Sequence, residues 1–535
     1  MNMAAEGPPT LILDRRISLS DAGSVSWGRR RIALSEAAVT RARESFARLQ
    51  TALAETRHVY GLTTGFGPLA NRLVTPENGE RLQQNLVFHL ASGVGDAFPW
   101  QVARAIVLAR LMALLQGASG ARPETVDRLV ALLNSGLAPA IPMRGTVGAS
   151  GDLTPLAHIV LCFQGHGHFV NQDGRRITAS QALADIGLTP LDLSHRDGLA
   201  LVNGTSAMTG VALLNTLRLE RALTWSVTLT GGLAEALGGR TEAWHRAFAK
   251  LRPHPGQVRA TERLLRATKG SGRVRDTPLA ARRLSGTSAV TQEDEAGQDA
   301  YSLRCAPQII GAVWDTADWH RRVTETELHA VTDNPIFPAD LPEIALHGGN
   351  FMGVHVALAA DAAANAATVL AGFHERQIAR ITDEKLNRGL PAFLSGGLVG
   401  LTSGLMGAQV TATALTAEMR LAGAASVQSI STNGANQDVV SQGTIAARML
   451  SDKIDLLFKV QAIAALSVAQ ALELLQRQDG GADLSPAAED LIGFVRKTSP
   501  FLDEDRPLGG EIDTLASRME AGQANAGTQG EVGRD

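Results

Sequence analysis

A run of small residues between Gly145 and Asp152, with the sequence GTVGASGD, is able to form an electrophile that no ordinary side chain supplies. If the backbone nitrogen of Gly151 attacks the carbonyl carbon of Ala149, loss of one water closes a five-membered ring. Loss of the Ser150 hydroxyl as a second water leaves an exocyclic methylidene carbon. A side chain at Gly151 would crowd the attacking nitrogen, so glycine is required there. The run therefore predicts a self-made electrophile, although a Gly/Ser loop before a helix is commoner than a cyclised one.

Two other uses of a Gly/Ser loop do not fit this segment. A phosphate-binding loop would need Gly-Lys followed by Ser or Thr, which the segment lacks. A nucleophile elbow of the form G-x-S-x-G would need a glycine at the position that Asp152 occupies. Neither phosphate binding nor a serine nucleophile is therefore expected here.

The elements that must position this loop are expected to be mainly helical. Apolar residues recur at three- and four-residue spacing in four long segments, at residues 102–115, 207–237, 354–386 and 441–475. Clear β-alternation is confined to short pieces such as residues 10–13 and 30–34. The pattern predicts a mostly α chain that folds as a bundle.

We expect three regions along the chain: an N-terminal domain with the loop over residues 1–205, a helical bundle over 206–520 and a disordered tail over 521–535. The polar stretch 263–297 is poor in core-forming residues, so we interpret it as a long surface loop or lid.

Residues that favour helix starts precede several of the expected helices. They are Thr154-Pro155, Gly204-Thr205-Ser206, Gly348-Gly349-Asn350 and Asn436-Gln437-Asp438. A helix N-terminus carries roughly half a positive charge and unpaired N–H groups. Several such ends at one pocket would stabilise negative charge there. Every helix needs a cap, however, so this pattern alone selects no function.

Composition excludes some partners. The chain has 535 residues, 44% of them hydrophobic, and a formal charge of -3, which provides no broad basic field for nucleic acid. Its two cysteines, Cys162 and Cys305, lie outside any C-x-x-C or metal-ligand spacing, which suits a reducing compartment. We find no secretory signal and no uninterrupted apolar stretch of bilayer length. A cytoplasmic protein without metal, nucleic acid or membrane partners is expected.

The segment GTVGASGDLTPLAH at residues 145–158 resembles the signature of the histidine, phenylalanine and tyrosine ammonia-lyases, and further blocks follow in family order along nearly the whole chain. These blocks are YGLTTGFG at 60–67, LVNGTSA at 201–207, QDAYSLRCAPQ at 298–308, TDNPIF at 332–337, GGNF at 348–351 and NQD at 436–438. The resemblance implies an elongated helical bundle and a homotetramer whose active sites draw residues from more than one subunit. It also implies a methylidene-imidazolone formed autocatalytically from Ala149-Ser150-Gly151, with no external cofactor.

The chain has just two tyrosines, and both lie in these blocks. By the resemblance, Tyr60 is the general base that removes the substrate's β-proton, and Tyr301 helps to activate the ring. The resemblance also makes Asn203 the hydrogen-bond donor to the imidazolone oxygen. Because a phenol is ordinarily protonated at neutral pH, a tyrosine base needs positive surroundings such as the helix N-termini above.

Arg304 lies one helical turn after Tyr301, so the two side chains are expected to share a face. A planar guanidinium is suited to holding a substrate carboxylate through two hydrogen bonds. The resemblance adds four residues of the pocket or carboxylate region, namely Asn334, Phe351, Asn433 and Gln437. One departure from the family pattern is His329, which stands where relatives have asparagine.

Residues 80–90 are predicted to form a helix with Leu82, Leu86 and Leu90 on one stripe and His89 at its edge. By the resemblance, the pair at positions 89 and 90 differs between the classes: it is Ser-His in histidine lyases, Phe-Leu in phenylalanine lyases and His-Leu in tyrosine lyases. The His89-Leu90 pair therefore implies L-tyrosine, because an imidazole can bond the phenol hydroxyl while leucine contacts the ring. Gln437 also favours tyrosine over histidine as the substrate, because by the resemblance histidine lyases have glutamate at this position.

The expected reaction is the non-oxidative deamination of L-tyrosine to trans-p-coumarate, a phenylpropanoid, and ammonia, with weaker action on L-phenylalanine. A tyrosine 2,3-aminomutase is the first alternative; it would use the same ring and return ammonia to the β-carbon, giving β-tyrosine. A non-catalytic helical assembly or binding protein that kept the fold is the second, and the intact set of motif residues argues against it.

Overall fold

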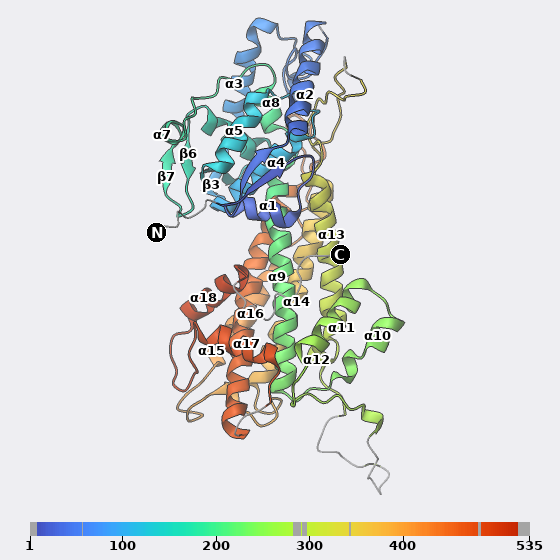
Figure 1. Ribbon diagram of the computed structural model, residues 1–535, viewed down its shortest axis with the longest axis vertical. Coiled ribbons are helices and arrows are strands. Elements are labelled where there is room, and N and C mark those ends of the chain that lie inside the picture. The colour runs from blue at the N-terminus through green and yellow to red at the C-terminus, as the bar shows by residue number, and fades with distance from the viewer. Residues whose placement is uncertain are drawn as a thin grey trace, which may run out of the picture. The chain divides into compact units, whose positions relative to one another are not determined.

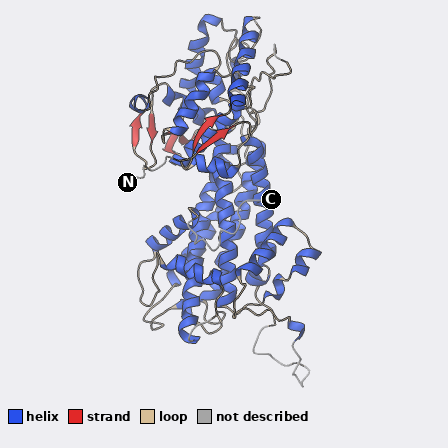
Figure 2. Ribbon diagram, viewed as in Figure 1, coloured by secondary structure: helices blue, strands red, loops and turns tan. Residues whose placement is uncertain are grey.

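The structure is a computed structural model that describes residues 8–55, 57–281, 290, 297–341, 344–479 and 483–522. Helices dominate it, and the strands are short (Figure 2). The prediction of a mostly α chain is confirmed. The chain divides into two compact units: the first takes in the described residues up to 217, with 320–361 and 424–449, and the second takes in the rest.

The first unit contains the short strands and the helices α1 to α8, most of which are labelled in Figure 1. Its strands are β1 (Thr10–Leu13), β2 (Arg31–Leu34), β3 (Val94–Ala97), β4 (Ala138–Pro139), β5 (Pro142–Arg144), β6 (His168–Val170) and β7 (Arg176–Thr178). Its helices are α1 (Leu19–Ser26), α2 (Glu36–Ala54), α3 (Gly79–Leu90), α4 (Trp100–Leu115), α5 (Pro123–Asn134), α6 (Leu153–Phe163), α7 (Ala179–Asp185) and α8 (Asp197–Val202), with single 3-10 turns at Gly67–Leu69 and Pro76–Asn78.

Strand pairing in this unit is local. β1 and β2 pair in parallel, with Thr10 opposite Arg31 and Leu13 opposite Leu34. β3 pairs with β5, and β6 lies between β4 and β7, in both cases antiparallel. The sheets are therefore small additions to a helical core.

Helix α4 is the centre of the first unit's core. It is mainly apolar and almost wholly buried, with Arg104 and Arg110 as its buried charged residues, as expected for a helix surrounded by others. Its neighbours include α1, α2 and α5, while α3, α6 and α8 contact one another as a second group. Helix α2 begins where the Ser35 side chain accepts from the N–H of Ala38, a standard N-cap. The group of α3, α6 and α8 carries the site described below.

Four long helices have residues in both units: α9 (Ser206–Ala236), α13 (Ala306–Leu328), α14 (Val354–Thr382) and α16 (Gly443–Asp479). The remaining helices of the second unit are α10 (Arg246–Leu251), α11 (Pro255–Ala267), α12 (Tyr301–Arg304), α15 (Met406–Leu421), α17 (Pro486–Arg496) and α18 (Gly509–Glu520), with single 3-10 turns at Thr241–Trp244, Leu279–Ala281 and Ala392–Leu394. Inside the second unit, burial lowers the pKa of His374 to about 4, so this ring is neutral at pH 7.

The expected helices and strands are present with small changes at their ends, but three expected caps are misplaced. Helix α6 starts at Leu153 after Asp152, so Thr154 is not its cap. Helix α14 starts at Val354, and α16 starts at Gly443 because Gln442 has a φ of 58°, a left-handed conformation that interrupts a helix. The segments 348–350 and 436–438 are therefore loops. Only Ser206, at the start of α9, lies where the cap pattern placed a helix start.

Two other expectations change. The predicted loop at 263–297 begins with helix, since α11 runs to Ala267, and its residues 282–289 and 291–296 lie outside the described residues, as do 523–535 of the expected tail. In the described part of the chain, α14 and residues 443–478 of α16 are long and apolar enough to cross a membrane by length and composition, although no apolar stretch of bilayer length was expected. Their apolar windows are 67% and 83% buried in the protein, as in core helices.

Candidate active site

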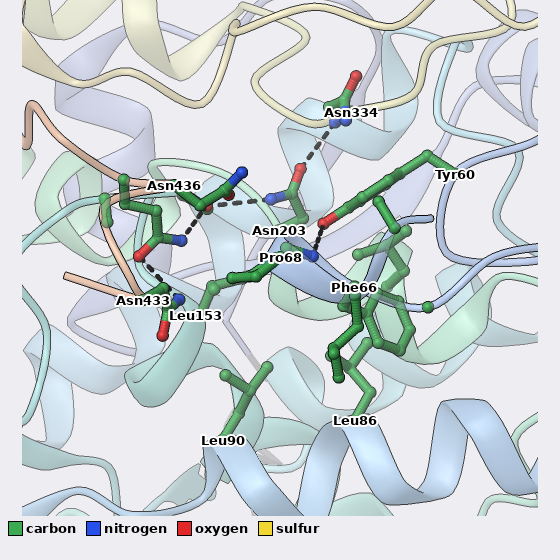
Figure 3. Close-up of a pocket in the computed structure, with 18 of the residues that line it drawn as sticks. Tyr60, Phe66, Pro68, Leu86, Leu90, Leu153, Asn203, Asn334, Asn433 and Asn436 are labelled. Carbon is green, nitrogen blue, oxygen red and sulfur yellow. Dashed lines mark hydrogen bonds between the residues drawn. The ribbon is translucent and has the colours of Figure 1, made fainter. Parts of the chain in front are cut away.

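A cavity of about 870 Å³ in the first unit brings together most of the residues singled out from the sequence (Figure 3). Those that line it are Tyr60, His89, Leu90, Ala149, Ser150, Asn203, Asn334, Phe351, Asn433 and Gln437. They come from segments spread over almost four hundred residues of sequence, at the loop after α2, the end of α3, the loop before α6 and three later loops. The motif residues of this unit therefore form one site.

The backbone around Ser150 accepts only glycine at the next position. Gly151 has a φ of 70°, and a Cβ there would come within 2.2 Å of the carbonyl oxygen of Gly204. Bridge pairings join Ala149 to Gly151 and Gly151 to Gly204, so the loop is bent on itself and held against the start of α9. This cradle fits a segment in which the nitrogen of Gly151 must approach the carbonyl carbon of Ala149.

Asn203 fixes the oxygen that would become the ring oxygen. Its side-chain amide nitrogen donates to the carbonyl oxygen of Ser150 at 3.1 Å, and its side-chain oxygen accepts from the backbone N–H of Asn334 at 2.7 Å (Figure 3). The two bonds set the orientation of the amide. The side chain of Asn334 in turn accepts from the backbone N–H of Gly348 at 2.7 Å. A donor is thus aimed at the place where an imidazolone would collect negative charge.

Gln437 contacts the other functional atom of Ser150. Its amide nitrogen donates to the Ser150 hydroxyl at 3.0 Å, and its amide oxygen accepts from the side chain of Asn433 at 2.9 Å. Asn433 has a φ of 51°, a conformation that asparagine tolerates better than most residues. The loop at 433–437 therefore holds the hydroxyl that would leave as water.

The hydroxyl of Tyr60 points into the cavity. Its oxygen accepts a hydrogen bond from the backbone N–H of Gly67 at 2.7 Å (Figure 3), and its ring meets Phe66 edge to face at 6.2 Å between centroids. The backbone N–H of Tyr60 donates to Nε2 of His347 at 3.1 Å. The phenol is therefore held at both its oxygen and its main chain.

Part of the cavity wall is apolar. Leu86 of α3 lies beside Phe66, and Leu90 of the same helix, Leu153 and Pro68 complete this wall (Figure 3). His89 also lines the cavity, and partial loss of water lowers the pKa of its imidazole. The wall therefore offers apolar surface to a flat ring, and the His89 imidazole is the polar group beside it.

Tyr301 and Arg304 do not line this cavity; they form α12 in the second unit. Their expected shared face is confirmed, since the Arg304 guanidinium carbon lies 4.8 Å from the centre of the Tyr301 ring. Tyr301 is 68% exposed, which is high for an aromatic residue. The pair is therefore displayed at the surface of this chain.

Two buried side chains hold α12 in place. Trp244 donates through its indole N–H to the carbonyl oxygen of Leu303, and Gln377 donates to that of Ser302, each at 2.9 Å. These bonds satisfy carbonyl groups of a helix that has a single turn. The exposed position of Tyr301, with the partly buried Arg304 beside it, is thus a fixed feature of the second unit.

Two buried polar residues were not anticipated as part of the site. Gln83 of α3 contacts the backbone next to Tyr60 and is taken up below. Asp152 accepts from the backbone N–H of Met208 at 2.7 Å and from the Thr444 hydroxyl, so it ties the loop to α9 and α16. Burial raises the pKa of Asp152 to about 6. Because each role depends on contacts far away in sequence, no local pattern indicated either residue.

The departure at His329 does not disturb the site. Its Nε2 lies 3.1 Å from both the backbone nitrogen and the oxygen of Ile17, whereas Asn334 keeps its bonds to Asn203 and Gly348. Asn334 therefore keeps its place in the cavity despite this departure from the family pattern.

The chain belongs to the aromatic amino acid lyase family, whose model matches residues 17–497. The matched residues include all those that line the cavity around Ser150.

Individual relatives match over nearly the full length. The chain is 59% identical to a tyrosine ammonia-lyase of Cereibacter sphaeroides over 520 residues, which cover 97% of this chain and 99% of that protein. It is 40% identical to an MIO-dependent tyrosine 2,3-aminomutase of Streptomyces globisporus over 512 residues, covering 92% and 93%. A crystal structure of a tyrosine aminomutase from Streptomyces globisporus superposes with a TM-score of 0.91 at 36% identity, covering 96% and 97% of the two chains.

Proposed function

We propose that this chain deaminates L-tyrosine non-oxidatively to trans-p-coumarate and ammonia, and acts more weakly on L-phenylalanine. The observation that carries the proposal is that one cavity holds the Tyr60 hydroxyl and the Ser150 loop together with an apolar wall and His89. The 59% identity to a tyrosine ammonia-lyase supports it.

Ala149, Ser150 and Gly151 supply the electrophile in this proposal, as a methylidene-imidazolone formed without any external cofactor. The first water consists of the Ala149 carbonyl oxygen and the two amide hydrogens of Ser150 and Gly151. The second water consists of the Ser150 hydroxyl and the α-hydrogen of Ser150. The finished group supplies an electrophilic carbon for the substrate amine. The Gly151 cradle and the amide of Asn203 support this assignment, because they fit the bent backbone and the remaining Ser150 oxygen.

Tyr60 is the general base. The β-proton of the substrate moves to its phenolate oxygen while ammonia departs from the neighbouring carbon. The Gly67 N–H that donates to this oxygen stabilises negative charge on it. The edge-to-face contact with Phe66 fixes the ring, so that the oxygen keeps its place.

His89 recognises the phenol of tyrosine. Because its pKa is lowered from 6.5, the imidazole is neutral at pH 7 and has a nitrogen free to accept the phenol proton in a hydrogen bond. Leu86 and Leu90 cover the ring itself. Phenylalanine would leave the imidazole without a partner, which favours tyrosine.

The carboxylate of the substrate is held by Arg304 of another copy of the chain in a homotetramer. Among the described residues that line the cavity none is Lys or Arg, yet a substrate carboxylate calls for a cation. Arg304 and the exposed Tyr301 meet that need if a second copy brings α12 to the cavity. We further propose a reducing compartment such as the cytoplasm, because Cys162 and Cys305 are both free.

An aminomutase is the second candidate, because aminomutases resemble the chain closely in sequence and fold. Purified protein incubated with tyrosine, phenylalanine and histidine, followed by chromatography of each mixture over time, separates the two. Free p-coumarate that accumulates from tyrosine supports the lyase. β-Tyrosine that appears first and dominates would replace it with the mutase, and no tyrosine product would overturn both.

A further inference from the structure

Gln83 is a completely buried amide that joins three segments of the site. It lies in α3, six residues before His89. Its amide nitrogen donates to the carbonyl oxygen of Gly61 at 2.8 Å, and its amide oxygen accepts from the backbone N–H of Leu199 at 2.9 Å. Gly61 follows Tyr60 directly, and Leu199 belongs to α8, whose end leads into Asn203.

Both backbone groups depend on Gln83 for a partner. Leu199 is the third residue of α8, so its N–H is one of those that a helix leaves free at its start. The carbonyl of Gly61 is part of a turn in which Gly61 has a φ of 71°. A buried polar group without a partner destabilises its conformation, so loss of the amide would release both segments.

Packing leaves no room for another arrangement. A Cβ on Gly61 would come within 2.7 Å of a Leu199 methyl carbon, and a Cβ on Gly198 within 2.9 Å of the Gln83 amide oxygen. The turn, the helix start and the amide therefore meet through two close contacts between backbone and side chain. One side chain sets the distance between them.

We infer that Gln83 is a positioning residue that keeps the base Tyr60, the donor Asn203 and the specificity helix α3 in register. This inference rests on the proposed function, because it assigns Gln83 to the same reaction. Gln83 touches no reacting atom; it acts through the backbone next to Tyr60 and ahead of Asn203. Displacement of a catalytic group by about 1 Å is enough to slow a reaction about a hundredfold.

Gln83→Glu separates this role from a contribution to folding alone. The new side chain has the same shape and still accepts from Leu199, but when ionised it has no proton to donate to Gly61. When protonated it makes both bonds again. The titratable groups on α3 and on the helical elements in contact with it are shared with the wild type. They are Glu77 on the 3-10 turn Pro76–Asn78, Glu80, Arg81 and His89 on α3, His158 and Cys162 on α6, and Asp197 on α8. A change in the pH profile relative to the wild type therefore reports the new carboxyl.

The test measures kcat and KM for tyrosine from about pH 6 to about pH 9 in wild type, Gln83→Glu and Gln83→Leu. Position 83 is completely buried, and burial raises the pKa of a carboxyl from its usual value of about 4.3 toward this range. Gln470→Glu is the control for a buried carboxyl remote from the site, since Gln470 is almost as deeply buried but contacts Leu394, Leu502 and Arg496 in the second unit. Peptide mass spectrometry of residues 149–151 checks that each variant has formed its ring.

We expect kcat of Gln83→Leu to fall about 10- to 100-fold with a smaller change in KM. Gln83→Glu should lose as much at high pH and recover toward the wild type as pH falls, while Gln470→Glu keeps the wild-type profile. If Gln83→Leu does not fold, Gln83→Glu still decides the matter. The inference would be overturned if Gln83→Glu folds, forms its ring and keeps the wild-type pH profile of kcat. It would also be overturned if Gln470→Glu showed the altered pH profile expected for Gln83→Glu. Wild type without a tyrosine product would overturn the proposed function instead.

Discussion

The amide nitrogen of Asn203 donates to the carbonyl oxygen of Ser150 at 3.1 Å, although the two residues are 53 positions apart. That oxygen remains after the two dehydrations that Ala149, Ser150 and Gly151 would undergo. The donor is in place before any ring exists, and the backbone of Asn334 fixes its orientation. The site is therefore preorganised both to close the ring and to withdraw charge from it.

Tyr60→Phe should preserve the fold and reduce kcat about a hundred- to ten-thousand-fold, because it removes only the oxygen that takes the β-proton. The Phe66 contact remains, so the ring keeps its place. Steady-state kinetics with tyrosine, alongside thermal unfolding as a control for folding, makes the measurement. Turnover close to that of the wild type would remove Tyr60 from the mechanism.

His89→Phe should invert the substrate preference. The variant removes the partner of a buried phenol hydroxyl and presents an apolar surface to phenylalanine. Tyrosine should lose about 1–3 kcal/mol, or about five- to a hundredfold in relative kcat/KM, while phenylalanine loses little. Each enzyme serves as its own reference when both substrates are measured. A variant that still strongly prefers tyrosine would show that another residue recognises the hydroxyl.

Arg304→Ala should weaken substrate binding and turnover together, by about 1.5–3 kcal/mol for a charge-assisted contact. If Arg304 acts in the site of another copy, hybrid tetramers of Arg304→Ala and Tyr60→Phe chains should regain activity, because some sites then combine intact Tyr60 with intact Arg304. The hybrids are obtained by co-expression with two affinity tags, and each variant alone is the control. Hybrids as inactive as the single variants would contradict the shared site.

Asp152 should make stability depend on pH. Its pKa is raised from 3.8 to about 6 in the folded chain, so between these values the folded state holds more protons and stability falls as pH rises. Asp152→Asn keeps an acceptor for the Met208 N–H but does not ionise. From about pH 4 to about pH 7 the wild type should lose about 2 kcal/mol of unfolding free energy relative to this variant. Denaturant unfolding at several pH values measures the difference, and parallel curves would refute it.

Much of the fold and part of the site follow from the sequence. Three- and four-residue apolar spacing located the long helices, because burial of one face imposes that period. The motif residues of the first unit, such as Tyr60, Ser150 and Asn203, do meet in one cavity. The roles assigned to them remain predictions for the mutants above.

The rest depends on contacts that no local pattern encodes. Gln83 bonds Leu199 across 116 residues, and Asp152 bonds Thr444 across 292, while each looks ordinary among its neighbours in sequence. The late start of α16 depends on a left-handed Gln442, which no propensity indicates. The place of Arg304 relative to a substrate depends in our proposal on a second copy of the chain.

The mass of the peptide that spans Ala149, Ser150 and Gly151 tests the central claim most directly. In fully active wild-type enzyme this peptide should be lighter than its sequence by two water molecules, one from ring closure and one from the Ser150 hydroxyl. The same peptide from Ser150→Ala cannot lose the second water, and that variant should have lost nearly all turnover while keeping its fold. An unmodified peptide in fully active wild-type enzyme would contradict the self-made electrophile.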